Sequence, residues 1–140
     1  MRKTFKGCAG LLAIAIFQLI SFSTFAETAW IRIAETDDGT RFETKPGSFE
    51  FSETRGKTPV AVLVGRQFIV KSKKIELQKW YVTATDCKNK MGKLTTLSVS
   101  GEFQFENDFV FDGGTVASTV AKFICDVAGQ SIKNAASKGL

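Results

Sequence analysis

Residues 1–26 have the pattern of an export signal. Basic residues at positions 2, 3 and 6 precede an apolar run over 9–22, and the small residues Thr24 and Ala26 suit cleavage after Ala26. A retained membrane anchor is the alternative, but Gln18 interrupts the run, which falls short of the ~20 residues of a membrane-spanning helix. We therefore predict that residues 1–26 are removed and that the protein is exported, either to the periplasm or to the cell surface.

Export also determines how the cysteines behave. Cys8 leaves with the signal, whereas Cys87 and Cys125 remain. Two cysteines in an oxidising compartment most simply form one disulfide. Cys87 and Cys125 are 125 − 87 = 38 residues apart. On the chain-entropy treatment, closing a loop of that length stabilises the fold by ~4 kcal/mol. A reactive pair of free thiols is the alternative, which the absence of a CxxC spacing disfavours.

Short apolar or alternating segments predict a mostly β domain over residues 27–129. The segment 60–70 is apolar on both faces, which is typical of a central strand, and Gly65 indicates a bulge or bend within it. The most regular alternation runs over 97–106, where Phe103 and Phe105 are predicted to face the core. The predicted strands lie near residues 30–33, 40–43, 49–51, 60–70, 75–85 and 97–106.

Two further segments complete the predicted fold. In 75–85 the alternation slips between Leu77 and Trp80, which indicates another bulge. A helical stripe follows Thr115, the expected N-cap, and residues 130–140 are predicted to form a frayed tail. The expected class is α+β and mostly β: an antiparallel sheet of about five to six strands, with a C-terminal helix linked to it by a Cys87–Cys125 disulfide.

The composition argues against several functional classes. The chain contains no histidine, which removes the His-dependent nucleophile arrangements and the commonest transition-metal ligand. Loss of the three basic residues in the leader lowers the net charge from +5 to +2, too little to indicate nucleic acid as a partner. We therefore predict a protein that is not an enzyme, carries no cofactor or metal and has no stable membrane insertion after cleavage.

Three acidic or glycine-rich features remain as weaker catalytic or ligand candidates. Glu102 and Glu106 share one face of a predicted strand and form a possible carboxylate pair, although a solvated sheet face explains them better. Asp108 and Asp112 suit calcium only loosely, because no calcium loop surrounds them. Gly113-Gly114 precedes the helix without the lysine of a phosphate loop, which favours a plain helix start.

Lysines and one tyrosine are the candidate binding residues. Lys88, Lys90 and Lys93 follow Cys87, so the disulfide is expected to hold them in place. A second lysine group, at positions 71, 73 and 74, lies at the other end of the 75–85 strand and favours a solvated turn. Trp80 and Tyr81 point to opposite faces of that strand, so one is expected in the core and the other, Tyr81, at a binding surface.

The order of these motifs resembles the bacterial surface-adhesin E family. The likeness rests on Lys79-Trp80-Tyr81-Val82 running into Asp86-Cys87, with Ile124-Cys125 on a final helix. The resemblance implies an exported domain that binds a protein partner, such as a host extracellular-matrix or serum protein, partly through the lysines at 88, 90 and 93. The family also includes lipid-anchored and haem-binding members, but this chain has neither a lipobox nor a histidine. The alternative function is a periplasmic inhibitor or accessory protein of an envelope enzyme such as lysozyme.

Overall fold

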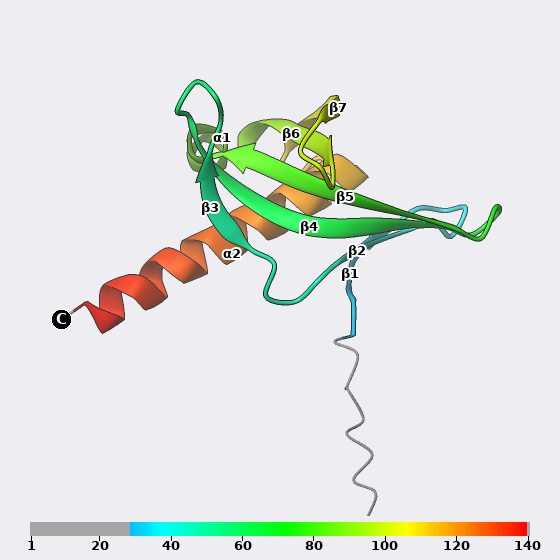
Figure 1. Cartoon of the computed structure of the whole chain (residues 1–140), viewed down its shortest axis with the longest axis horizontal. Coiled ribbons are helices and arrows are strands. Elements are labelled where there is room, and N and C mark those ends of the chain that lie inside the picture. The colour runs from blue at the N-terminus through cyan, green and yellow to red at the C-terminus, as the bar shows by residue number, and fades with distance from the viewer. Residues whose placement is uncertain (1–28, 140) are drawn as a thin grey trace, which may run out of the picture.

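A computed structural model describes residues 29–139 as one antiparallel sheet crossed by a long helix (Figure 1). The predicted export signal lies outside the described residues. The sheet has seven strands in the order β1-β2-β4-β5-β6-β7, and β3 pairs with β4 beside this path. The predicted class is thus confirmed. The elements are β1 (Ile31–Glu35), β2 (Arg41–Thr44), β3 (Glu50–Glu53), β4 (Pro59–Ile69), β5 (Lys74–Thr83), α1 (Ala84–Asn89), β6 (Met91–Ser98), β7 (Phe103–Val110) and α2 (Val116–Lys138).

The strand β4 is the centre of the sheet, as its apolar sequence predicts. It pairs with β2 through one part of its length and with β3 through another, and with β5 along nearly all of it. Val60, Ala61, Val62 and Leu63 are all buried. Consecutive buried residues in a strand require cover on both faces, which explains the absence of alternation.

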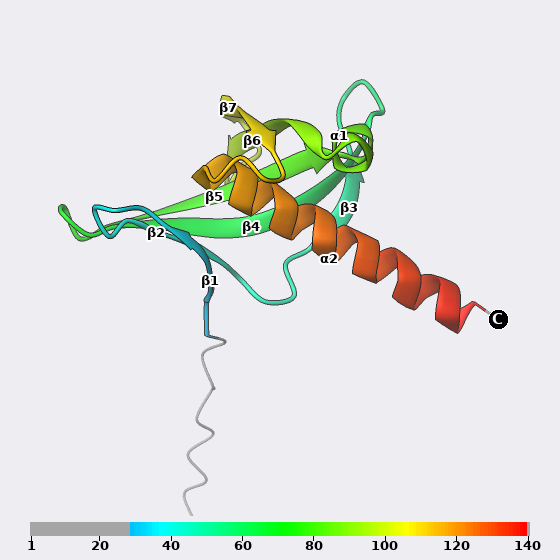
Figure 2. The ribbon, with the colours of Figure 1, turned by 180° about the vertical axis from the view of Figure 1, so that it is seen from behind.

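The helix α2 covers one face of this sheet (Figure 2). Val120, Ala121 and Ile124 are fully buried and belong to one core cluster with Trp80 and Val82 of β5. Thr115 is the N-cap, and its Oγ1 accepts a hydrogen bond from the Ser118 N–H at 3.1 Å. The stripe of small and branched apolar residues therefore fixes which side of α2 meets the sheet.

The segment 97–106 is a hairpin and not the single strand predicted from its alternation. The strand β6 ends at Ser98, Gly101 has φ +92°, and β7 begins at Phe103. The alternation persists through the turn, so hydrophobic periodicity alone does not reveal the reversal. The core positions predicted here are also wrong, because Phe103 is 64% exposed and Phe105 is 45% exposed.

Neither predicted bulge in the long β4–β5 hairpin exists. The register runs unshifted from Val60 opposite Thr83 to Ile69 opposite Lys74. In β5 the apparent slip arises because Leu77 lies exposed on one face, while the polar residue Gln78 is buried on the other. Gly65 serves a different purpose from a bulge, since the Trp80 ring occupies the space beside its Cα.

The C-terminal helix continues to Lys138, beyond residue 130 where the sequence predicts fraying. Its last turns extend past the edge of the sheet (Figure 1). A side-chain hydrogen bond from Gln130 Nε2 to Asn134 Oδ1 (3.1 Å) and two alanines at 135 and 136 favour helix there without tertiary cover. Over residues 29–139, no helix is long and apolar enough to cross a membrane.

Candidate functional site

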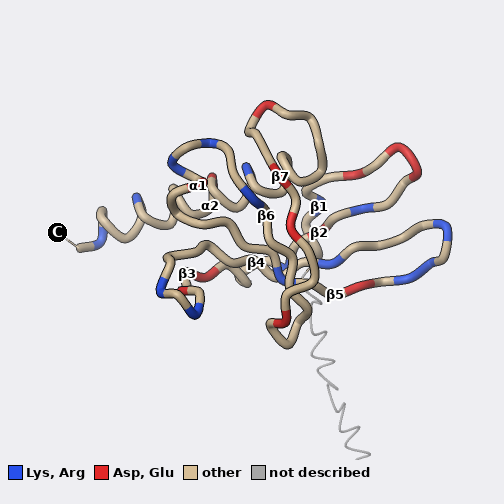
Figure 3. Tube along the Cα trace, turned by 90° about the horizontal axis from the view of Figure 1, so that it is seen from above, with Lys and Arg blue, Asp and Glu red and all other residues tan. Residues whose placement is uncertain are grey.

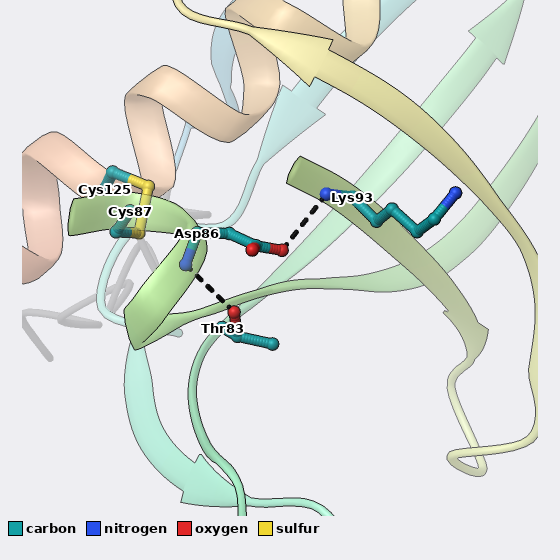
Figure 4. Close-up of a disulfide and its surroundings, with 5 residues drawn as sticks. All are labelled: Thr83, Asp86, Cys87, Lys93 and Cys125. Atoms are coloured by element: carbon teal, nitrogen blue, oxygen red, sulfur yellow. Dashed lines mark hydrogen bonds between the residues drawn. A yellow bond between two sulfur atoms is a disulfide. The ribbon is translucent and has the colours of Figure 1, made fainter. Parts of the chain in front are cut away.

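A disulfide joins the short helix α1 to α2. Cys87 and Cys125 have their Sγ atoms 2.07 Å apart and their Cα atoms 5.4 Å apart, so the predicted pairing is confirmed (Figure 4). Cys87 lies within α1, one turn after β5 ends, and the bond fixes this turn against the middle of α2. The bond is consistent with an oxidising compartment.

The Asp86-Cys87 sequence has a local structural role beside the disulfide. Thr83 Oγ1 accepts the Asp86 N–H at 3.1 Å as the N-cap of α1, and Asp86 Oδ2 accepts the Lys93 N–H at 3.1 Å (Figure 4). A side chain at Gly92 would overlap the Asp86 carboxylate. Asp86 therefore ties the end of β5 to the start of β6 and sets the direction of the intervening turn.

The three candidate lysines lie on this turn but in different environments. Lys88 is on α1, Lys90 is its left-handed C-cap with φ 59°, and Lys93 is on β6. The Lys93 ammonium is 2.8 Å from Asp108 and 3.4 Å from Glu106, both on β7. The Asp108 hydrogen bond, with the two nearby negative charges, raises the pKa of Lys93. The Lys93 charge is therefore matched within the protein.

Tyr81 lies on the face of the sheet opposite α2. It lines a hollow of about 260 Å³ with Val62, Leu97, Gly101 and Arg55, between the β3–β4 turn and the β6–β7 turn. As expected from their adjacency, Trp80 is buried in the core and Tyr81 is half-buried. The basic residue nearest to this hollow is Arg55, which the sequence gives no reason to single out.

Lys88 lines a separate hollow on the helix side. This apolar groove of about 360 Å³ lies between the β3–β4 hairpin and the second half of α2, and Phe51, Cys125 and Ile132 contribute to it. The structure therefore does not bring Lys88 and Tyr81 into one site, although both lie near the same end of β5.

Exposed apolar residues accompany Tyr81 along β5. Alternation places Ile75, Leu77 and Lys79 on the same face as Tyr81, and Ile75 and Leu77 are about half exposed (52% and 51%). On the neighbouring hairpin, exposed Phe103 pairs with Leu97. The even spacing of Ile75, Leu77 and Tyr81, at i, i+2 and i+6, is the sequence signal that identifies this face.

The second lysine group is neutralised in part by a neighbouring acidic turn. Lys71, Lys73 and Lys74 lie at the tip of the β4–β5 hairpin, and the β1–β2 turn with Asp37 and Asp38 lies beside it (Figure 3). Gly39 of the acidic turn approaches Val70 closely, and Lys71 contributes to the lowered pKa of Asp38. Of these lysines, Lys71 thus acts on the acidic turn, whereas Lys74 pairs with Glu76 of its own strand at 3.3 Å.

The weaker catalytic candidates either form contacts within the protein or lie exposed in the part of the chain described. Glu106 binds Lys93, and Glu102 is exposed in the β6–β7 connection. Asp108 also binds Lys93, and residues 29–139 hold no group of three or more acidic, cysteine or histidine side chains placed to bind a metal. The Gly113 N–H donates to the Val110 carbonyl at 2.8 Å, so this donor is already used within the protein and does not face a bound anion.

Comparison with known proteins returns no matching family model, no matching curated protein and no matching solved structure. The resemblance to the surface-adhesin E family therefore remains a prediction from the motifs in the sequence. Its Asp86-Cys87 element has the structural explanation given above, in which it closes a turn and anchors a helix.

Proposed function

We propose that this protein is a non-enzymatic exported domain that binds a protein partner through the sheet face that α2 leaves uncovered. The supporting observation is the row of Ile75, Leu77 and Tyr81 on β5, with exposed Phe103 on the adjacent hairpin. Several exposed apolar residues on one face of a sheet are typical of protein interfaces, in which aromatic side chains often supply most of the binding energy.

Charge around this face supports a partner with an acidic rim. Lys79 lies within the row, and Arg55 lines the hollow beside Tyr81. Lys88 and Lys90 follow the end of the same strand, and Lys88 lines the separate groove on the helix side, so these two lysines act on a partner at this face only as longer-range charges. Rim charges of this kind mainly accelerate association, whereas the apolar centre determines how slowly the complex dissociates.

The surface-adhesin E resemblance supplies the first partners to test, namely host matrix and serum proteins such as laminin and vitronectin. Immobilised candidates are titrated with the wild type, with a Leu77→Ser/Tyr81→Ser variant and with Ile132→Ser as a matched control. Ile132 is exposed to a similar extent as Leu77, at 59% against 51%, but lies on α2. Loss of at least about tenfold in affinity for the double variant alone supports the proposal.

Equal binding by the double variant and the wild type contradicts the proposed surface. A second variant, Lys88→Glu/Lys90→Glu, tests the contribution of the two lysines separately. This variant is expected to associate more slowly than the wild type, and its dissociation rate is expected to stay nearly unchanged. Its affinity is also expected to fall less steeply with rising salt concentration than that of the wild type. Lys93 is left intact in this variant, because its removal would leave the carboxylates of Glu106 and Asp108 without the ammonium group that they contact.

Location distinguishes this function from the alternative, an inhibitor of an envelope enzyme. Treating intact cells with protease degrades the protein if it is at the cell surface, which favours host-facing adhesion. Protection, followed by release on osmotic shock, places it in the periplasm and favours an envelope partner. In that event, lysozyme activity measured with and without the purified protein tests inhibition directly.

A further inference from the structure

A third hollow, called the cleft from here on, lies between α2 and the face of the sheet that α2 covers. It has a volume of about 410 Å³ and is bounded by the first turns of α2 and by the inner faces of β2, β4, β5, β6 and β7. This is within the usual range for small-molecule sites in proteins. Phe42, Trp80 and Phe105 form apolar walls, and the amides of Gln67, Gln78 and Asn107 also line it.

The position of Gln78 is the most unusual feature of this cleft. It is only 4% exposed and lies on the core face of β5, two residues before the buried Trp80. Its Oε1 accepts the Trp80 indole N–H at 3.0 Å, and within residues 29–139 no hydrogen bond engages its amide nitrogen. The amide nitrogen is not among the fully buried atoms that lack a partner, so it stays accessible from the cleft and can donate to a polar group of a bound molecule.

The charges of the lining favour a neutral ligand. No lysine or arginine lines the cleft, and its one carboxylate, Asp108, is 2.8 Å from the Lys93 ammonium. An anionic ligand would find no cation there, and a cationic ligand would compete with Lys93. The amides offer both donors and acceptors, while the aromatic walls offer flat apolar surfaces for a ring.

We propose that this cleft binds a neutral sugar that carries an N-acetyl group. The acetamido group matches the amide of Gln78 in hydrogen bonding, and its methyl group matches the apolar wall that Val116 and Val120 of α2 add. The sugar ring packs on Phe105 near the mouth, where Phe105 is 45% exposed. This site is independent of the proposed protein-binding surface, because the two lie on opposite faces of the sheet.

The test uses Trp80 as an internal reporter. The chain has two tryptophans, so a Trp30→Phe background leaves Trp80, in the wall of the cleft, as the source of indole fluorescence. Titration with the disaccharide of N-acetylglucosamine is expected to give a saturable change with a Kd between about 10 μM and 1 mM. Cellobiose, which lacks the acetamido groups, is expected to bind at least about tenfold more weakly.

Two matched pairs of variants locate the binding. Ala117→Phe fills the cleft from α2, whereas Thr119→Phe, on the exposed side of the same helix, leaves it open. Phe105→Ser removes a wall at the mouth, whereas Phe103→Ser changes a residue that is more exposed and does not line the cleft. The first member of each pair is expected to lose at least about tenfold in affinity, and the second to keep it.

Each remaining result overturns the proposal. An absence of saturation up to about 10 mM excludes a specific site of useful affinity. Equal affinity for cellobiose contradicts the assigned acetamido group. Unchanged binding by both Phe105→Ser and Ala117→Phe, in variants whose circular dichroism and melting temperature match the parent, places the sugar elsewhere.

Discussion

The indole ring of Trp80 on β5 lies against the Cα of Gly65 on β4, in the space that a β-carbon at Gly65 would occupy. Because the ring is buried with Val82 and Ile124, it has no room to turn away. The glycine therefore allows the largest side chain of the core to lie flat on the central strand. Tight packing of this kind is sensitive to a single added methyl group.

Gly65→Ala is accordingly expected to destabilise the fold by about 1–3 kcal/mol, because the alanine methyl forces the indole out of its position. Thermal or urea unfolding measures the change. Gly56→Ala is the matched control, since a β-carbon there meets only Thr54 Oγ1, at 3.8 Å. Equal stability of the two variants would show that the strand and ring can separate at little cost.

Loss of the disulfide is expected to cost about 4 kcal/mol in the Cys87→Ser/Cys125→Ser variant, since the bond closes a loop between residues 38 apart. Urea unfolding of the variant and of the reduced wild type measures this loss. The two should agree, because both open the same loop. A variant as stable as the oxidised wild type would mean that the packing of α2 on the sheet suffices.

The ion pair between Glu43 and Arg66 is expected to matter more than other ion pairs. Arg66 Nε is 2.6 Å from Glu43 Oε2, and only 9% of the Glu43 side chain is exposed. Arg66→Met leaves this carboxylate with only the longer contact to Arg41 Nε, at 3.9 Å. The substitution is expected to cost about 2 kcal/mol, less than for a fully buried pair, because Arg66 itself is partly exposed and Arg41 remains. The measurement is chemical unfolding at neutral pH.

Arg32→Met provides the control for that prediction. Arg32 pairs with Glu35 at 2.7 Å, but both side chains are largely exposed, so the expected change is within about 0.5 kcal/mol. If the two arginine variants unfolded at the same urea concentration, burial of Glu43 would not be the source of the effect.

The β1–β2 turn contains a carboxyl group with a shifted titration. The Thr36 hydroxyl donates to Asp38, the Thr40 N–H donates to it at 3.1 Å, and together they lower its pKa below the usual 3.8. Because the ionised form is favoured in the folded state, this contribution to stability is present above pH ~4 and is lost as the pH falls through the lowered pKa.

Thr36→Val is expected to raise the pKa of Asp38 towards its usual value, since it removes the largest of these contributions. Carbon-13 NMR of the side-chain carboxyl, followed from pH 6 to pH ~2, measures the pKa directly. An unchanged Asp38 pKa would assign the shift to the Thr40 N–H instead.

Several features of the fold follow from the sequence alone because their causes are local. The continuous apolar run of β4 predicts its central place in the sheet. Consecutive residues of a strand point to opposite faces, so an unbroken apolar run indicates that both faces are buried. The i, i+3, i+4 stripe and the hydroxyl of Thr115 predict the start and buried face of α2. The described residues contain only two cysteines, so their pairing within that part of the chain has one solution.

Tertiary structure decided the features that depend on which segments meet. The 97–106 alternation fits both a strand and a hairpin, and only pairing of β6 with β7 exposes Phe103 and brings Glu106 and Asp108 to Lys93. The role of Gly65 depends on a ring from another strand. Gln78 disturbs the alternation of β5, yet only the placement of α2 shows that its amide faces a cleft. Local periodicity indicates which residues share a face of a strand or helix, whereas contacts between distant segments determine whether that face is covered and by what.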